Sequence, residues 1–310
     1  MVFSGQYPPA TVSTALPSSA AAEIDTLGLA GLAGDPGWRR PVLVDRDLLV
    51  LTTSGHGDAE LDFEPIPCRP GTLLRVHAGQ VLRCPCPQLD ATVVRWNANA
   101  LQGLDVDPDA VPTWRQLAGE DEDAVINEVS QLAVDCARHR TVPAARGLLR
   151  HQLAVLLLRL TLAGGGPPTS RPEEATFHRL CREVERGYRH TRRVEDYAAR
   201  LGCSVRTLTR ACLAVTGRSA KQVIDERVAL QASRLLAATD EPIARIGRGL
   251  GFSEPTNFGR FFTRETGTSP GAFRAAREQP LPGQVVRPRT LVEPSLDRPL
   301  DALPDARRPR

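Results

Sequence analysis

Five side chains in the second half of the chain have the types and the spacing to recognise base pairs. Arg206 and Arg210 are four residues apart, so they share one face if this stretch is helical. Thr256 and Arg260 repeat this spacing, and Asn257 stands beside them. An arginine can donate two hydrogen bonds to guanine, an asparagine can pair with adenine, and a threonine methyl group can contact a thymine methyl group. These residues therefore have the chemistry to read base edges.

Two of these arginines have a second interpretation. Arg210 and Arg260 could instead form structural ion pairs with Glu226 or Glu265, and would then be unavailable to a ligand. Arg206 stands at the start of the expected helix and is the better candidate for a functional role.

The distribution of charge favours a polyanionic ligand for this half of the chain. The net charge is +3, yet residues 1–170 sum to −6, residues 171–278 to +7 and residues 279–310 to +2. Lys221 is the sole lysine, so nearly all the positive charge is carried by guanidinium groups, which make two-pronged contacts with phosphates and guanine. Nucleotide bias in the genome can enrich arginine, but the asymmetry survives it. The second half alone is predicted to meet a polyanion.

An internal repeat must position these side chains. Three blocks recur in register 49 or 50 residues later: Val194–Gly202 at Ile243–Gly251, Leu208–Cys212 at Phe258–Phe262, and Thr216–Val223 at Thr266–Phe273. Each unit is predicted to contain a short helix, a tight turn with glycine, and a second helix behind a serine N-cap, Ser204 or Ser253. Two helices joined in this way form a helix-turn-helix, whose second helix enters the major groove of DNA.

One continuous helix is expected between the two units, from Ala220 to Ala238. It would hold the units apart at a fixed spacing. Two recognition helices separated by one turn of DNA, ~34 Å, would occupy successive major grooves on one face. A monomer would then read two short elements about 10 bp apart, and a dimer would read two such sites.

With these blocks, the second half resembles the DNA-binding domain of the AraC/XylS family of bacterial transcription regulators. The most specific matches are Ile246–Ser253, Phe258–Phe262 and Thr266–Arg274. The resemblance implies that the base-facing residues are Arg206, Arg210, Thr256, Asn257 and Arg260. A second set is suited to phosphate contacts, which fix register without reading sequence: Thr207, Thr209, Arg218, Ser253 and Arg264.

Three residues depart from the family pattern. Cys212 stands where the first unit usually has phenylalanine, Ala220 where proline is common, and Gly247 where alanine is usual. The small Ala198 and Gly247 would let the two helices of each unit approach closely. We expect somewhat weaker packing and an intact DNA-binding function.

The first half reads as short strands followed by two helices. Between Pro41 and Asn97, apolar or alternating runs are separated by Gly, Pro and Asp, which predicts a small antiparallel barrel or sandwich. Residues 69–81 resemble the cupin-like sensor barrel that many members of the family carry. Amphipathic helices are expected from Glu120 and over Ala144–Leu162. The second is rich in leucine around much of its surface, which suits either a twin helix in a dimer or packing on its own barrel.

The predicted fold class is α+β with two domains, a small N-terminal β-barrel (cupin-like) with dimerisation helices and a C-terminal all-α double helix-turn-helix. Residues 1–35 are expected to be a flexible arm, and residues 36–163 a cupin-like effector-binding and dimerisation domain. Residues 164–172 are a Gly/Pro-rich linker, residues 173–278 the DNA-binding domain, and residues 279–310 a disordered tail rich in Pro and Arg.

Metal, cofactor and membrane functions have little support in the residues. His56 and His77 each lack the partners that a metal-binding cupin needs, so we expect no metal, no cofactor and no catalytic residues. Cys84-Pro-Cys86 is a weak signal for a soft metal or a redox pair, and seven scattered cysteines suit a reducing compartment. No apolar stretch approaches the ~20 residues of a membrane span, and no basic residue precedes Arg39, so a cytoplasmic location is expected.

The resulting hypothesis is a sequence-specific DNA-binding regulator whose barrel binds a small effector. Its expected partners are double-stranded DNA, a second copy of the chain and a small molecule, and by analogy with the family an activator would also meet RNA polymerase. Three alternatives remain open at this point. They are a constitutive DNA binder whose first half only dimerises, a regulator controlled by a docking protein, and a cupin-class enzyme.

Overall fold

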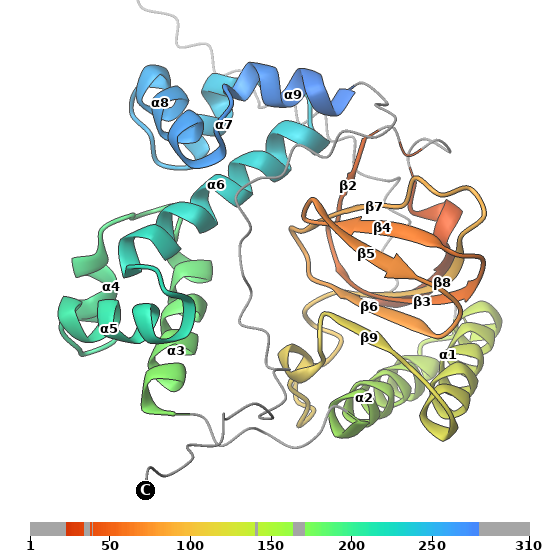
Figure 1. Cartoon of the computed structure of the whole chain (residues 1–310). Coiled ribbons are helices and arrows are strands. Elements are labelled where there is room, and N and C mark those ends of the chain that lie inside the picture. The colour runs from red at the N-terminus through yellow and green to blue at the C-terminus, as the bar shows by residue number, and fades with distance from the viewer. Residues whose placement is uncertain (1–22, 34–37, 39, 140–141, 164–170, 279–310) are drawn as a thin grey trace, which may run out of the picture.

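A β-rich domain and a helical domain lie side by side along one long helix (Figure 1). The computed structural model describes residues 23–33, 38, 40–139, 142–163 and 171–278. The predicted fold class, α+β with two domains, is confirmed. The predicted linker, apart from Arg171 and Pro172, and the predicted tail at 279–310 lie outside the described residues.

The β-rich domain consists of two antiparallel sheets within the described residues. The first has the order β1-β8-β3-β6-β9 and the second the order β2-β7-β4-β5, with no strand pair joining them, so the predicted barrel is an open one. The strands are β1 (Ile24–Gly28), β2 (Val42–Leu43), β3 (Asp47–Ser54), β4 (Gly57–Leu61), β5 (Glu64–Cys68), β6 (Thr72–Val76), β7 (Val81–Arg83), β8 (Asp90–Trp96) and β9 (Trp114–Gln116).

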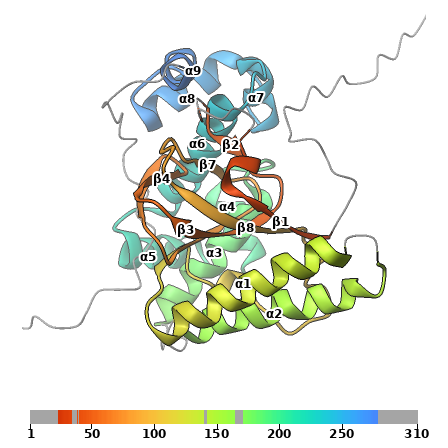
Figure 2. The same cartoon turned by 90° about the vertical axis from the view of Figure 1, so that its right-hand side faces the viewer.

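The first sheet is buried on both faces, which explains its continuous apolar runs. Successive side chains of a strand point to opposite faces. Leu48 and Val50 of β3 join the core between the sheets, whereas Leu49 and Leu51 pack on the other side with Trp96. That outer side is covered by helices α1 (Glu120–His139) and α2 (Ala145–Ala163), which run next to each other beneath the sheet (Figure 2). Both helices were predicted from their apolar spacing.

Three strands of this domain were not expected from the sequence: β1, β5 and β9, the last of which lies beyond the range of residues 41–97 in which strands were predicted. Residues 24–28 of the predicted arm form β1, which pairs with β8, because Ile24, Leu29 and Leu32 have apolar side chains that the domain buries. The rest of the arm up to residue 22 lies outside the described residues. The sequence also gave no sign of β5, which has two prolines and lies at a sheet edge, where a strand needs fewer N–H donors.

The helical domain contains the two predicted units on either side of a central helix. Its helices are α3 (Pro172–Gly187), α4 (Val194–Arg200), α5 (Val205–Thr216), α6 (Ala220–Ala238), α7 (Ile243–Gly249), α8 (Pro255–Thr266) and α9 (Pro270–Glu278). The central helix α6 has the predicted bounds, and it begins at Ala220 because Ser219 caps its first turn, accepting a hydrogen bond from the Gln222 N–H. The units α4–α5 and α7–α8 are therefore held at the two ends of one rigid element (Figure 1).

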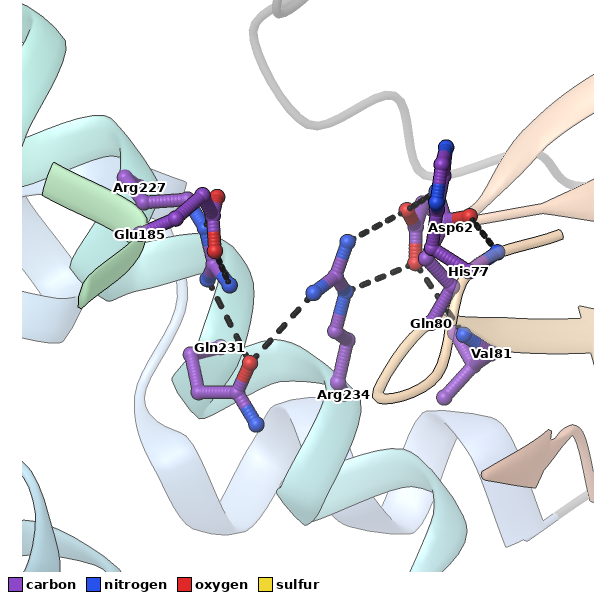
Figure 3. Close-up of polar contacts among 8 residues, drawn as sticks. All are labelled: Asp62, His77, Gln80, Val81, Glu185, Arg227, Gln231 and Arg234. Carbon is purple, nitrogen blue, oxygen red and sulfur yellow. Dashed lines mark hydrogen bonds and ion pairs between the residues drawn. The ribbon is translucent and has the colours of Figure 1, made fainter. Parts of the chain in front are cut away.

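The two domains meet where the β4–β5 hairpin touches the central helix. The Asp62 carboxylate accepts hydrogen bonds from Arg234 Nε at 2.7 Å and Nη2 at 2.6 Å (Figure 3). Asp62 and Phe63 form a two-residue turn with φ of +51° and +74°, a conformation that a phenylalanine rarely adopts. Phe63 is nevertheless held there, because its ring lies edge-on to Phe273 of α9 at 5.7 Å in the core of the helical domain.

Candidate nucleic-acid interface

The first recognition helix, α5, presents its arginines to solvent. It begins as predicted, because the Ser204 hydroxyl accepts a hydrogen bond from the Thr207 N–H at 3.0 Å. The inner face of α5 is buried, and the outer face exposes Arg206 and Arg210. Among the described residues, neither arginine has a hydrogen bond or an ion pair. Both guanidinium groups are thus available to a ligand.

The second recognition helix, α8, presents its polar side chains in the same way but begins differently. Its N-cap is Glu254, so the prediction that Ser253 caps it is wrong. Pro255 takes the first helical position, where its fixed φ suits the helix and its missing N–H costs nothing, and this moves the start of the helix beyond Ser253. Thr256, Asn257 and Arg260 are all exposed.

Close packing fixes α8 against the helix before it. Phe258 is fully buried, and a Cβ atom added to Gly247 of α7 would lie 3.0 Å from Phe258 Cγ. The predicted close approach at Gly247 is therefore present. Phe252 and Phe262 pack against the same ring with centroids 5.3 and 6.0 Å away. Aromatic packing of this kind leaves the exposed face of α8 in one orientation.

The two glutamates considered as partners of Arg210 and Arg260 form ion pairs with other arginines instead. Glu226 pairs with Arg218 at 2.5 Å, and Glu265 pairs with Arg264 at 2.7 Å. Arg264 also reaches Asp225, at 3.3 Å. Within the described part of the chain, Arg260, like Arg210, has no ion pair. Among the described residues, the arginines predicted to face bases are thus unpaired, whereas two arginines predicted to contact phosphates have protein carboxylates as partners.

The remaining phosphate candidates lie near the starts of the two recognition helices. The Thr207 hydroxyl is 2.9 Å from the Ser204 hydroxyl, and Thr207 and Thr209 are both half-buried on α5. Ser253 is exposed in the turn before α8. Each hydroxyl can still donate to or accept from a ligand.

A groove of about 1450 Å³ separates the two helix-turn-helix units. Thr209 of α5 lines one side, and Asn257 and Arg260 of α8 line the other. The structure therefore brings both recognition helices to one concave surface.

Sequence reasoning missed two arginines in this groove. Arg192 and Arg193, between α3 and α4, line it together with Lys221 of α6. The residues 49 positions after the two arginines are Glu241 and Pro242, so the internal repeat gave no sign of them. The sequence offered one signal for them, which is that they stand directly before the first repeated block, which begins at Val194.

Comparison with known proteins decides the family. The helix-turn-helix domain family matches residues 197–276. Over 55 residues the chain is 46% identical to the arabinose operon regulatory protein of Escherichia coli (strain K12), a match that covers 18% of each protein. Over 191 residues it is 30% identical to the HTH-type transcriptional activator RhaR of Klebsiella pneumoniae, covering 61% of this chain and 66% of that protein. The chain belongs to the AraC/XylS family.

These matches span less than two thirds of the length of either relative. Among solved structures, the chain is 32% identical to the DNA-binding domain of AdpA, the global transcriptional factor, in complex with a target DNA. That alignment has a TM-score of 0.30 and covers 34% of this chain and 93% of the other. By its match to the family model, this AraC/XylS-family protein carries a DNA-binding helix-turn-helix domain in residues 197–276.

None of the helices in the described ranges is both long and apolar enough to cross a membrane. In the same part of the chain, His, Cys, Asp and Glu side chains form no group of three or more that could hold a metal ion.

Proposed function

We propose that this chain is a cytoplasmic transcription activator that reads two DNA elements about one helical turn apart, one with each recognition helix. One observation carries the proposal. Five side chains with base-reading chemistry are exposed on the two helices that border one groove: Arg206, Arg210, Thr256, Asn257 and Arg260. The three arginines of this set have no partner among the described residues. An activator would also contact RNA polymerase, and the name of the RhaR relative supports that role.

The proposed domain organisation assigns residues 36–163 to effector binding and dimerisation and residues 173–278 to DNA binding. The strand β1 adds residues 24–28 to the first of these domains. We assign the coupling between effector and DNA to the contact of Asp62 with Arg234, because it joins the β-rich domain to the helix that separates the two recognition helices. An effector acts through this contact only if it binds the docked and undocked arrangements with different affinity.

The proposed dimer forms through α2. Its inner face is buried against the sheet and α1, but an apolar stripe of Leu148, Val155, Leu158 and Leu162 remains exposed on the other side. These residues follow one another at intervals of seven, three and four, the spacing with which two helices pack. Leu162 is 81% exposed, and burying such a stripe on a second copy of the chain removes it from water.

The proposal is tested by selecting bound sequences from a random pool of double-stranded DNA at one stated salt concentration. The full chain is compared with the Arg206→Ala and Arg260→Ala variants. We expect a motif of two elements about one turn apart, with the first variant relaxing one element and the second variant the other. Equally weak binding to all sequences would show that the helical domain is a non-specific module.

The alternative is that the first half only dimerises and that the chain binds DNA constitutively. This alternative predicts a DNA affinity that no metabolite changes. A screen of metabolites by thermal shift, followed by DNA titration with each hit, distinguishes the two. The effector hypothesis is lost if the β-rich domain binds nothing and its deletion leaves regulation unaltered.

A further inference from the structure

Arg192 lines the groove between the two helix-turn-helix units and has no anionic partner among the described residues. Arg192 lies with its guanidinium carbon 3.6 Å from the centroid of the Phe252 ring, and 5.7 Å from that of Phe261. It crosses from the loop before α4, in the first unit, to the aromatic core of the second unit. Among the described residues Arg192 has no hydrogen bond and no ion pair. Its N–H donors are therefore free while its flat face is fixed.

The charges around Arg192 leave it short of a counter-ion. Arg264 approaches the same Phe261 ring at 5.4 Å, so two guanidinium groups flank one aromatic side chain. The Asp225 carboxylate attracts Arg192, but it is buried and already pairs with Lys221 and with Arg264. Burial and the neighbouring Arg264 charge lower the pKa of Arg192, against the opposing effect of Asp225. An anion in this position would relieve the repulsion between the two arginines.

We propose that Arg192 binds a DNA backbone phosphate midway between the two elements that the recognition helices read. This inference rests on the proposed function. If α5 and α8 occupy successive major grooves, the DNA backbone between those grooves must pass over the groove that both helices border. A guanidinium group held on an aromatic ring offers its donors in a fixed plane, which matches the two oxygens of a phosphate.

This phosphate contact would set the position of the two recognition helices along the DNA and would not recognise bases. Arg192 belongs to the first unit and packs on Phe252 of the second, so a phosphate bound there touches the place where the two units meet. The contact fixes the register of both helices on the DNA and carries no sequence information.

The inference is tested with the full chain and its selected two-element DNA site. One strand carries a single methylphosphonate, a neutral replacement, at successive positions between the two elements. We expect at least one central position where the replacement weakens wild-type binding about tenfold or more, since a hydrogen bond between charged groups contributes that much. Arg192→Ala should lose a similar factor on unmodified DNA and show no further loss at that position.

Two further variants make the result specific. Arg182→Ala removes an exposed arginine of α3 that does not line the groove, and should keep the full methylphosphonate effect. Arg192→Lys keeps the charge without the planar fork, and should bind with intermediate affinity and remain sensitive to the replacement. The slope of log K against log salt should fall by about 0.9 for Arg192→Ala, as for one lost phosphate contact.

Several results would overturn the inference. If Arg192→Ala and wild type lose the same factor at every central methylphosphonate, Arg192 acts only by packing on Phe252. If no central replacement affects wild type, yet inorganic phosphate displaces DNA better than chloride at equal ionic strength, the site binds a free anion instead. Absence of any two-element motif for the wild type refutes the proposed function itself, so the two failures are distinguishable.

Discussion

Truncation of the carboxylate that joins the two domains should destabilise the protein strongly. Asp62 and Arg234 form two short hydrogen bonds, and their side chains are only 14% and 7% exposed. Asp62→Ala leaves the Arg234 guanidinium buried, with Gln231 Oε1 at 3.4 Å as its remaining hydrogen-bond partner (Figure 3). A buried charge that loses its partner costs about 3–5 kcal/mol.

Truncation of the arginine should cost less, because Asp62 keeps other donors. The Asp62 carboxylate still accepts from Gln80 Nε2 at 2.7 Å and from the Val81 N–H at 3.1 Å. We therefore expect Arg234→Ala to lower the free energy of unfolding by about 1–3 kcal/mol. The double variant should be less destabilised than the sum of the single variants, with a coupling of about 0.5–3 kcal/mol.

A double-mutant cycle in urea, followed by circular dichroism, measures these differences. Asp58→Ala is the matched control, because Asp58 is an exposed carboxylate on the same hairpin, and its loss should change stability by less than about 0.5 kcal/mol. The reasoning is refuted if Asp62→Ala is as mild as the control. It is also refuted if the two single effects add within about 0.5 kcal/mol, since additivity is the behaviour of sites that do not interact.

Three further predictions concern packing, thiols and assembly. Gly247→Val should destabilise the helical domain by about 1–3 kcal/mol, because the new side chain would overlap the Phe258 ring; an unchanged urea midpoint would contradict this. Burial raises the pKa of the Cys84 thiol to about 12, so iodoacetamide at pH 8.5 should label Cys84 far more slowly than half-buried Cys86 until the protein unfolds; equal rates by mass spectrometry would count against it. Leu158→Glu should shift the full chain from dimer to monomer in analytical ultracentrifugation, and a wild type that is already monomeric would remove the proposed dimer interface.

The helices of the DNA-binding domain could be predicted because the signals for them are local. Apolar spacing decides which face of a helix is buried, and Leu208 and Phe258 therefore point inward while Arg206 and Arg260 point outward. A serine before the first turn marks the start of α6 in the same way. Local signals failed at the start of α8, where a proline, rather than the serine before it, determines the first turn.

The amino-acid sequence by itself determined the repeat, the exposed polar face of each recognition helix and the excess of positive charge in one half. Only the tertiary structure decided which charges are neutralised, because the partners are far apart along the chain. Arg264 and Asp225 are 39 residues apart, and Arg234 and Asp62 are 172 residues apart. No pattern within one element can reveal such a pair. Nor can such a pattern reveal that Arg192 has no ion pair among the residues that the structure describes. Folding therefore decides which arginines pair with carboxylates and which, among the described residues, keep an unpaired guanidinium group.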